Sequence, residues 1–237
     1  MAATSVVTKT VLIADDTAFV RDRFQSALEG AGHTAIAVKS AAELLARMRS
    51  NRIDLLVVDL RLPDASGVGL VRSIRKVDQG KVPILVFSGT IASAEEVRDL
   101  ASLGVSGYVN EYSATQHILP SLAPHLYPDS FNRRSSPRVV LGIPVQYRFG
   151  NTIAAALALN LSHGGIAVRT TSPLDADARI KIRFRMPGSR HDVDVEGRVA
   201  WSDRRVGMGV QFEKVDGSSQ ALIDTFVDAH FFSNRKA

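Results

Sequence analysis

Two patterns of apolar residues divide this chain of 237 residues, and they predict two different kinds of fold. Up to about residue 126, short aliphatic runs alternate with amphipathic stretches of helical period. Beyond that point, apolar and polar residues alternate one by one over several segments, which is the pattern of half-buried strands. We therefore expect an α/β half followed by a β-rich half.

The first half contains five strand-like segments, each followed by a helical stretch. Strands are expected over 11–14, 34–38, 53–59, 82–87 and 107–109, and helices over 17–29, 40–48, 66–76, 93–103 and 114–122. Five such units predict a doubly wound, five-stranded parallel sheet covered by helices on both faces. Pro120 and Pro128 are expected to end the last helix, because proline removes a backbone donor.

Acidic residues follow two of these strands. Asp15 and Asp16 end the first strand, and Asp59 ends the third. Ligands of such sheets bind at the carboxyl ends of the strands, and three carboxylates there repel one another unless a cation lies among them. Oxygen ligands of this kind favour Mg²⁺, with water completing its coordination. The sequence therefore predicts a magnesium site at this edge.

Residues 9–126 resemble the receiver domain of two-component response regulators. The resemblance rests on Asp15-Asp16, Asp59 in Val57-Val58-Asp59-Leu60-Arg61-Leu62-Pro63-Asp64, Gly67, and Ser88 in Val86-Phe87-Ser88-Gly89. It implies that Asp59 is the phosphoacceptor for a histidine kinase or phosphotransfer protein. It also implies that Asp16, Asp59 and the carbonyl of Arg61 hold Mg²⁺, with Asp15 acting through water.

The same resemblance implies a switch made of two further residues. Ser88 would donate its hydroxyl to the phosphoryl group, and Tyr108 matches the aromatic residue that rotates on activation. A plain edge aromatic is the alternative for Tyr108. Two adjacent positions depart from the family: receivers carry a lysine three residues after this aromatic, followed by proline, whereas this chain has Glu111 and Tyr112.

The charge of Glu111 has the wrong sign for a phosphoryl clamp. At about 4 Å in a partly buried site, the repulsion costs on the order of several kcal/mol. Two alternatives follow: either Glu111 points outward and phosphorylation is weakly coupled, or the domain signals without phosphate.

The second half is expected to form a small antiparallel β-barrel followed by a helix. Strands are expected over 139–148, 153–161, 166–170, 179–186, 193–201 and 206–212, with hairpin turns at 150–151 and 187–189. Ser218 or Ser219 should cap a terminal helix that runs to about Phe232 and packs its apolar side on the barrel. Trp201 is expected in the core rather than as a ligand platform.

An arginine cluster and a polar turn in this half point to an anionic ligand. The cluster is Arg133-Arg134-Ser135-Ser136-Pro137-Arg138, and the turn is Asn160-Leu161-Ser162-His163-Gly164-Gly165. Arginines four apart offer planar forks for phosphate oxygens or for the Hoogsteen edge of guanine. Glycines let backbone N–H groups approach a ligand closely. Together they predict a receptor for a small guanine-bearing anion.

Residues from about 130 to 235 resemble the PilZ family, whose members bind cyclic di-GMP. The R-x-x-x-R element corresponds to Arg134 and Arg138, and the [D/N]-x-S-x-x-G element to Asn160, Ser162 and Gly165. The stretches 195–201 and 207–212 are also similar to the family's closing strands. The alternative is a degenerate PilZ domain that docks to proteins, is regulated by the receiver and binds no nucleotide.

The PilZ resemblance implies a role for each residue of the two motifs. Arg134 and Arg138 would grip phosphates and a guanine edge, and Asn160 and Ser162 would hydrogen-bond the ligand. Gly164 and Gly165 would permit its close approach. Arg133 either stacks on a second guanine of a ligand dimer or is simply solvated.

Charge and composition exclude several classes. Residues 1–126 hold 13 basic and 13 acidic residues, so the whole net charge of +5 lies in the second half. Basic residues there alternate along strands, without a recognition helix or interleaved aromatics, so no nucleic-acid partner is expected. Neither a membrane span nor a secretory signal is predicted, and with no cysteine the chain is expected to be cytoplasmic. No enzymatic nucleophile with a base is apparent.

The domains are expected to be 1–126, a receiver, and 127–237, a PilZ domain, with 127–138 as hinge and arginine motif. Ligand binding would order this hinge and alter the placement of the domains. Output would be contact with an unknown downstream protein that controls motility, adhesion or exopolysaccharide. His33, His117 and His125 lack carboxylate spacing and are expected at the surface.

Overall fold

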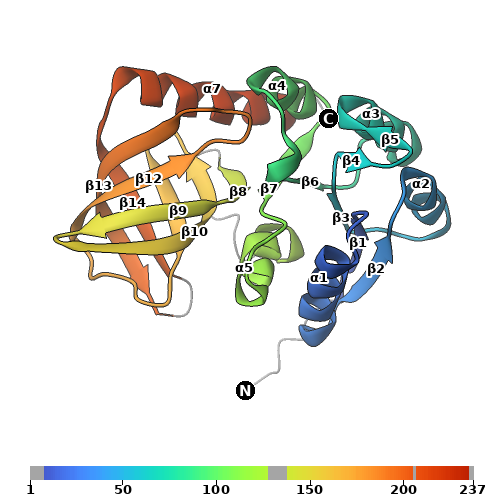
Figure 1. Cartoon of the computed structure of the whole chain (residues 1–237), viewed down its shortest axis with the longest axis horizontal. Coiled ribbons are helices and arrows are strands. Elements are labelled where there is room, and N and C mark those ends of the chain that lie inside the picture. Colours follow the sequence, from blue (N-terminus) through green and yellow to red (C-terminus); the bar gives the residue numbers. More distant parts are fainter. Residues whose placement is uncertain (1–7, 128–137, 205–206, 235–237) are drawn as a thin grey trace.

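The computed structural model describes residues 8–127, 138–204 and 207–234, with side chains up to residue 230. The α/β half and the barrel lie side by side, with the terminal helix crossing above the barrel toward the α/β half (Figure 1). The predicted fold class is confirmed: a five-stranded parallel sheet precedes an antiparallel barrel with a C-terminal helix. Among the described residues, no helix is both long and apolar enough to cross a membrane.

The parallel sheet has the strand order β2-β1-β3-β6-β7. Its strands are β1 (Thr10–Ala14), β2 (Thr34–Val38), β3 (Leu55–Val58), β6 (Ile84–Phe87) and β7 (Val105–Val109). A small hairpin, β4 (Arg61–Leu62) and β5 (Ala65–Ser66), follows β3, and a 3₁₀ turn, η1 (Ser88–Thr90), follows β6. Strands β1, β3 and β6 are buried along their whole length except for Thr10, as expected for strands covered on both faces.

Helices cover both faces of this sheet. They are α1 (Ala18–Gly30), α2 (Ala41–Ser50), α3 (Gly67–Asp78), α4 (Ala94–Ser102) and α5 (Thr115–Leu126). Helices α1 and α5 bury their apolar sides in one cluster, and α2, α3 and α4 bury theirs in another. The side chains of Ser40 and Ser93 accept hydrogen bonds from the amides of Glu43 and Glu96, which confirms the predicted cap of α2 and places one on α4.

Helix α5 does not end at Pro120, so the expectation of a proline stop there was wrong. The helix continues to Leu126 and contains both Pro120 and Pro124. Its buried residues Ile118, Leu122 and Leu126 recur every four positions against the sheet. Each interior proline costs about 3 kcal/mol, whereas burying a leucine or isoleucine side chain contributes about 1.5–3 kcal/mol. Burial of the three-residue stripe therefore offsets the lost hydrogen bonds.

The barrel is closed by the strand cycle β10-β9-β12-β13-β14-β11-β10. Its strands are β9 (Pro144–Phe149), β10 (Thr152–Ser162), β11 (Gly165–Arg169), β12 (Arg179–Arg185), β13 (Asp192–Asp203) and β14 (Gly207–Val215). Strand β12 alternates strictly between exposed basic and buried apolar residues, as predicted. The predicted strand over 139–148 is two strands, because β8 (Val139–Gly142) leaves the barrel at Ile143.

The terminal helix α7 (Gly217–Asn234) begins at least two residues earlier than predicted and has a different cap. Asp216 Oδ1 accepts hydrogen bonds from the amides of Ser218 and Ser219 at 3.0 and 2.9 Å. Asp216 therefore supplies the cap that we expected from a serine. The same hydrogen bonds, led by those from the serine hydroxyls, lower the pKa of Asp216.

Strand β8 joins the two halves into one sheet. On one side it pairs in parallel with β7, Tyr108 opposite Leu141, and on the other it pairs with β10, Val140 opposite Asn160. The described strands thus form a continuous sheet of 12. A Cβ on Gly107 would lie 2.6 Å from the Val140 carbonyl oxygen, so only glycine allows this approach.

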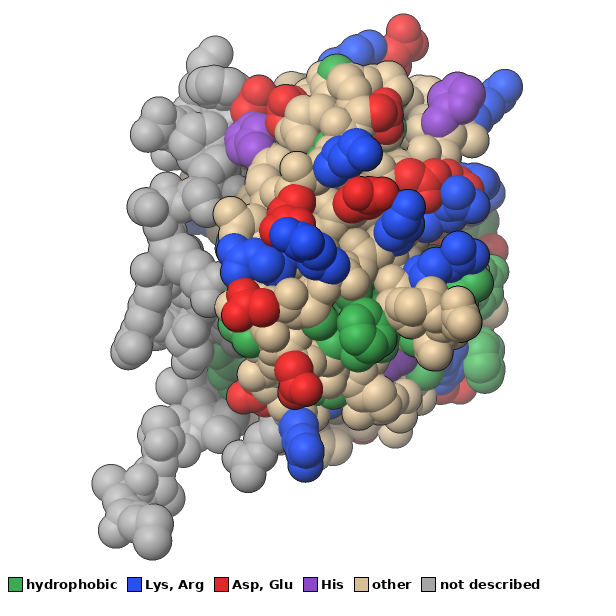
Figure 2. Space-filling model, turned by 90° about the vertical axis from the view of Figure 1, so that its left-hand side faces the viewer, with side chains coloured by type: hydrophobic (Ala, Val, Ile, Leu, Met, Phe, Trp, Pro, Cys, Tyr) green, Lys and Arg blue, Asp and Glu red, His purple; other side chains and the backbone are tan. Residues whose placement is uncertain are grey.

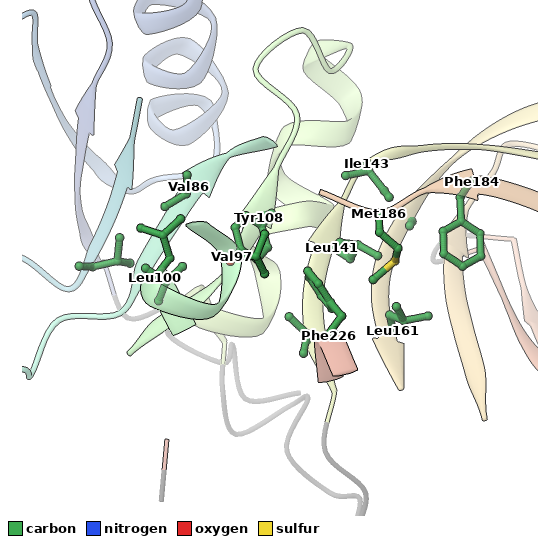
Figure 3. Packing of buried hydrophobic residues seen from close by; sticks show 14 of the residues in the cluster. Val86, Val97, Leu100, Tyr108, Leu141, Ile143, Leu161, Phe184, Met186 and Phe226 are labelled. Atoms are coloured by element: carbon green, nitrogen blue, oxygen red, sulfur yellow. The ribbon is translucent and has the colours of Figure 1, made fainter. Parts of the chain in front are cut away.

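The two halves also share a hydrophobic core. Tyr108, Val97 and Leu100 of the α/β half face Phe226 and Leu141 across the junction, and Met186 and Phe184 continue the packing into the barrel (Figure 3). These side chains belong to a single cluster of buried residues that runs from the parallel sheet to the barrel interior. The junction is therefore packed like a domain interior.

Candidate functional site

The three predicted metal-ligating carboxylates meet at the carboxyl edge of β1 and β3. One oxygen from each of Asp15, Asp16 and Asp59 lies within 4.8 Å of the others. Asp15 is buried and accepts a hydrogen bond from the amide of Thr17, whereas Asp16 is exposed. Desolvation, assisted by the charges of Asp59 and Asp16, raises the pKa of Asp15 to about 6. Such a cluster suits a divalent cation, which would remove the repulsion.

Glu111 points toward this edge rather than outward. Its side chain is only 7% exposed, and Oε2 accepts a hydrogen bond from the amide of Gly89 at 3.3 Å. A Cβ at Gly89 would collide with the Glu111 carboxylate, so the bare backbone of Gly89 leaves room for this side chain. Desolvation raises the pKa of Asp59, and the charges of Asp16 and Glu111 raise it further. The sequence left open whether the Glu111 side chain points outward or the receiver signals without phosphate. The structure excludes an outward-pointing Glu111.

The predicted switch residues occupy different environments. Ser88 begins the η1 turn directly after β6 and is half-buried. Tyr108 is completely buried, so it is not an edge aromatic. Its hydroxyl lies 3.0 Å from Nε2 of His230 on α7, and burial raises its pKa. This contact across 122 residues has no local sequence signal.

The predicted surface position of His33 was wrong. His33 is 4% exposed, and Nε2 lies 2.9 Å from the hydroxyl of Tyr127 at the end of α5. Desolvation, with the charge of Lys9, lowers the pKa of His33. The chain therefore holds a second, partly buried tyrosine–histidine pair, away from α7.

The polar turn of the barrel lies between β10 and β11, where it faces Arg138. Arg138 Nη1 donates a hydrogen bond to Asn160 Oδ1 at 3.0 Å, so two predicted ligand residues are already in contact. Ser162 Oγ donates to the carbonyl of Gly165 across the turn. Arg133 and Arg134 lie outside the described residues, as does the predicted hinge over 127–138 apart from its two end residues.

A hollow of about 400 Å³ opens beside these residues. It is lined by Arg138, Ser162, His163, Gly164, Gly165, Ile166, Ala200, Trp201, Gly209, Val210 and Gln211. Trp201, which we expected in the core, is half-buried and contributes to this wall. A flat indole beside arginine and asparagine side chains can stack on a base while those groups bind its edge and phosphates.

The sequence analysis missed the role of Trp201 in the hollow, because the alternation of its strand places this residue with the core residues. Gly209 was the one sequence feature that could have indicated that role. A Cβ on Gly209 would lie 2.0 Å from the indole nitrogen of Trp201, so the ring lies against bare backbone. Gly165 has a local role too: its Cβ would lie 2.7 Å from the Val210 carbonyl oxygen across the β11–β14 pairing. Gly164 is exposed, with open space around it.

Basic residues on the barrel's outer surface are matched by acidic neighbours. Blue and red side chains intermingle on this face instead of forming one basic field (Figure 2). The ion pairs across strands are Arg179–Glu213, Lys181–Glu196, Arg183–Asp194 and Arg185–Asp192. Because these exposed pairs are solvated, each contributes little to stability. They nevertheless neutralise the surface that nucleic acid would need.

Comparisons with known proteins match both halves of the chain. Residues 11–122 match the family model of the response regulator receiver domain, and residues 132–229 match that of the PilZ domain. The two-component response regulator PhoP of Pseudomonas aeruginosa is 37% identical over 100 residues, which cover 42% of this chain and 43% of PhoP. The acid tolerance regulatory protein ActR of Rhizobium meliloti is 32% identical over 113 residues, 47% of this chain and 56% of ActR.

Among solved structures, the chemotaxis response regulator CheY4 of Vibrio cholerae is similar at a TM-score of 0.46 and 25% identity. The similarity covers 50% of this chain and 99% of that structure. The chain thus spans about half the length of the two curated relatives.

Proposed function

This chain is a signal-transduction protein that joins a response regulator receiver domain to a PilZ domain, and we propose that it binds cyclic di-GMP in the hollow beside Arg138. Neither domain belongs to a catalytic family. The protein would act as a receptor whose output is contact with a downstream protein controlling motility, adhesion or exopolysaccharide.

The observation that carries this proposal is the contact of Arg138, which lines the hollow, with Asn160 of the neighbouring turn. The two residues come from separate motifs, yet their polar groups meet at 3.0 Å. Arginine supplies charge-assisted hydrogen bonds to phosphate, and Trp201 supplies a stacking surface for a purine. Preassembled groups lose little conformational entropy when a ligand binds.

The receiver would bind Mg²⁺ through Asp15, Asp16 and Asp59, and its family implies a histidine kinase as partner. The convergence of the three carboxylates supports the metal site, because Mg²⁺ would neutralise their repulsion. Asp59 would be the phosphoacceptor and Ser88 and Tyr108 the switch residues. With Glu111 buried at this edge, we propose that phosphorylation of Asp59 is inefficient and that the receiver signals largely without phosphate.

A titration of cyclic di-GMP into the full chain tests the receptor proposal. Trp201 is the only tryptophan and lines the hollow, so its fluorescence reports binding directly. We expect Arg138→Ala to weaken binding by at least about tenfold, the loss of one charged hydrogen bond. Arg183→Ala removes an exposed arginine of β12 instead and should bind like wild type.

Two results would contradict the receptor proposal. One is the absence of saturable binding to wild type at about 1 mM ligand, where the binding free energy is only about −4 kcal/mol. The other is equal binding by wild type and Arg138→Ala. The first result would leave the PilZ domain as a protein-docking module, to be tested by capture of partner proteins.

A further inference from the structure

Helix α7 holds the polar turn over 160–165, here called the nucleotide loop, from one side. Gln220 Nε2 donates a hydrogen bond to the carbonyl oxygen of His163 at 3.1 Å. The His163 ring is bound 2.8 Å from Asp228 Oδ1, two turns further along the same helix. His163 lines the hollow, whereas Gln220 and Asp228 lie outside it. Two hydrogen bonds therefore hold the loop on α7, and the helix residues that make them do not line the hollow.

The same helix is fastened to the receiver through Tyr108. The His230 Nδ1 atom lies 2.8 Å from the carbonyl oxygen of Phe226, which can only accept, so Nδ1 carries the proton. His230 Nε2 then accepts from the Tyr108 hydroxyl at 3.0 Å. The Phe226 ring packs against Tyr108 with 5.5 Å between centroids. Both polar partners are buried, so this hydrogen bond has no competition from water.

Both attachments lie on one continuous helix. From Gln220 to His230 the helix rises about 15 Å, and such a segment moves as a unit. Residues Asp228 and His230 are about 200° apart around the axis, so one faces the loop while the other faces the receiver. A change in the position of Tyr108 therefore displaces the residues that hold the loop.

We propose that α7 is a positioning element of the nucleotide site, and that the receiver sets its position through the Tyr108–His230 contact. This inference rests on the proposed binding of cyclic di-GMP. Gln220 and Asp228 are positioning residues, because they hold the loop without lining the hollow. Nucleotide affinity in the full chain then depends on a receiver residue that never contacts the nucleotide.

The Tyr108→Phe variant tests this coupling by removing one hydroxyl. We expect it to weaken cyclic di-GMP binding about fivefold, the low end of ordinary coupling between sites. His230→Gln cuts the same contact from the α7 side and should give a similar loss. Tyr127→Phe is the matched control, because it removes a hydroxyl bound to His33 Nε2 at the end of α5, without any contact to the described part of α7. It should bind like wild type.

A double-mutant cycle tests whether the effect of Tyr108 on nucleotide affinity passes through α7. In a Gln220→Ala/Asp228→Ala chain the loop is detached from α7, so adding Tyr108→Phe should cause no further loss. Equal affinities of wild type and Tyr108→Phe would overturn the coupling, and fully additive losses would overturn the route through α7. Saturable binding by wild type in either case shows that the receptor proposal itself stands.

Discussion

Replacing Glu111 with lysine is expected to raise the rate at which acetyl phosphate phosphorylates Asp59 by on the order of 100-fold, equivalent to about 2.7 kcal/mol. Glu111 is buried at the pocket edge, and its charge contributes to the raised pKa of Asp59. Exchanging a negative for a positive charge there replaces repulsion of the incoming phosphoryl group by attraction. At an effective dielectric of about 20, a unit pair about 4 Å apart interacts with about 4 kcal/mol, so the estimate is conservative.

The measurement is phosphate-affinity electrophoresis after incubation with acetyl phosphate and Mg²⁺. Asp59→Asn in the lysine background should abolish the shifted band, and Glu111→Gln should fall between wild type and lysine. Glu29→Lys makes the same change of net charge at the exposed end of α1 and serves as the control. Equal rates for wild type and Glu111→Lys would show that Glu111 does not limit phosphorylation.

Acidification is expected to destabilise the chain through His230. Burial lowers its folded-state pKa from 6.5 to about 4. Between these values the unfolded chain binds a proton that the folded chain excludes, so stability falls as pH falls. From pH 7 to pH 5 the loss from this group is about 2 kcal/mol, about a 30-fold change in the folding equilibrium.

Chemical denaturation of wild type and His230→Gln at several pH values measures this loss. Asp15 works in the opposite sense, because its raised pKa makes the folded state take up protons first as pH falls below about 6. That contribution is the same in both proteins. The loss of stability from His125 is also the same, because burial lowers the pKa of this residue to about 4 in both. The stability difference between the two proteins should therefore shrink with acid, and parallel curves would contradict the assignment.

Local sequence patterns predicted most strands and helices but not the contacts between distant elements. The strict alternation of β12 and the apolar runs of β3 and β6 identify these segments as strands. Both patterns can be seen in consecutive residues, without knowledge of the rest of the fold. The carboxylate site followed from the rule that strand ends meet at one edge. Helix α5 was misjudged because its stop signal, Pro120, was outweighed by burial of a stripe against a sheet formed elsewhere.

The candidate nucleotide site was only half predictable. Arg138, the described end of the arginine motif, does meet Asn160 of the polar turn. Trp201 and the helix that holds the loop had no local signal, because their roles arise from long-range contacts such as Asp228 with His163. Gly107, Gly165 and Gly209 were indirect signals, since each marks a place where another chain segment occupies the volume of a side chain.

Strand β8 has a consequence for building chimaeric sensors from this protein. A receiver that ends at residue 126 would leave the backbone groups of β7 unpaired and the Tyr108 ring without its partner Phe226. Such an exposed edge strand can pair with other chains and aggregate. A ribosome releases β7 well before β8 and α7, so the nascent receiver faces the same hazard until both have emerged. Transplantable units therefore need β8 and α7 carried along with the receiver, although both lie beyond the linker.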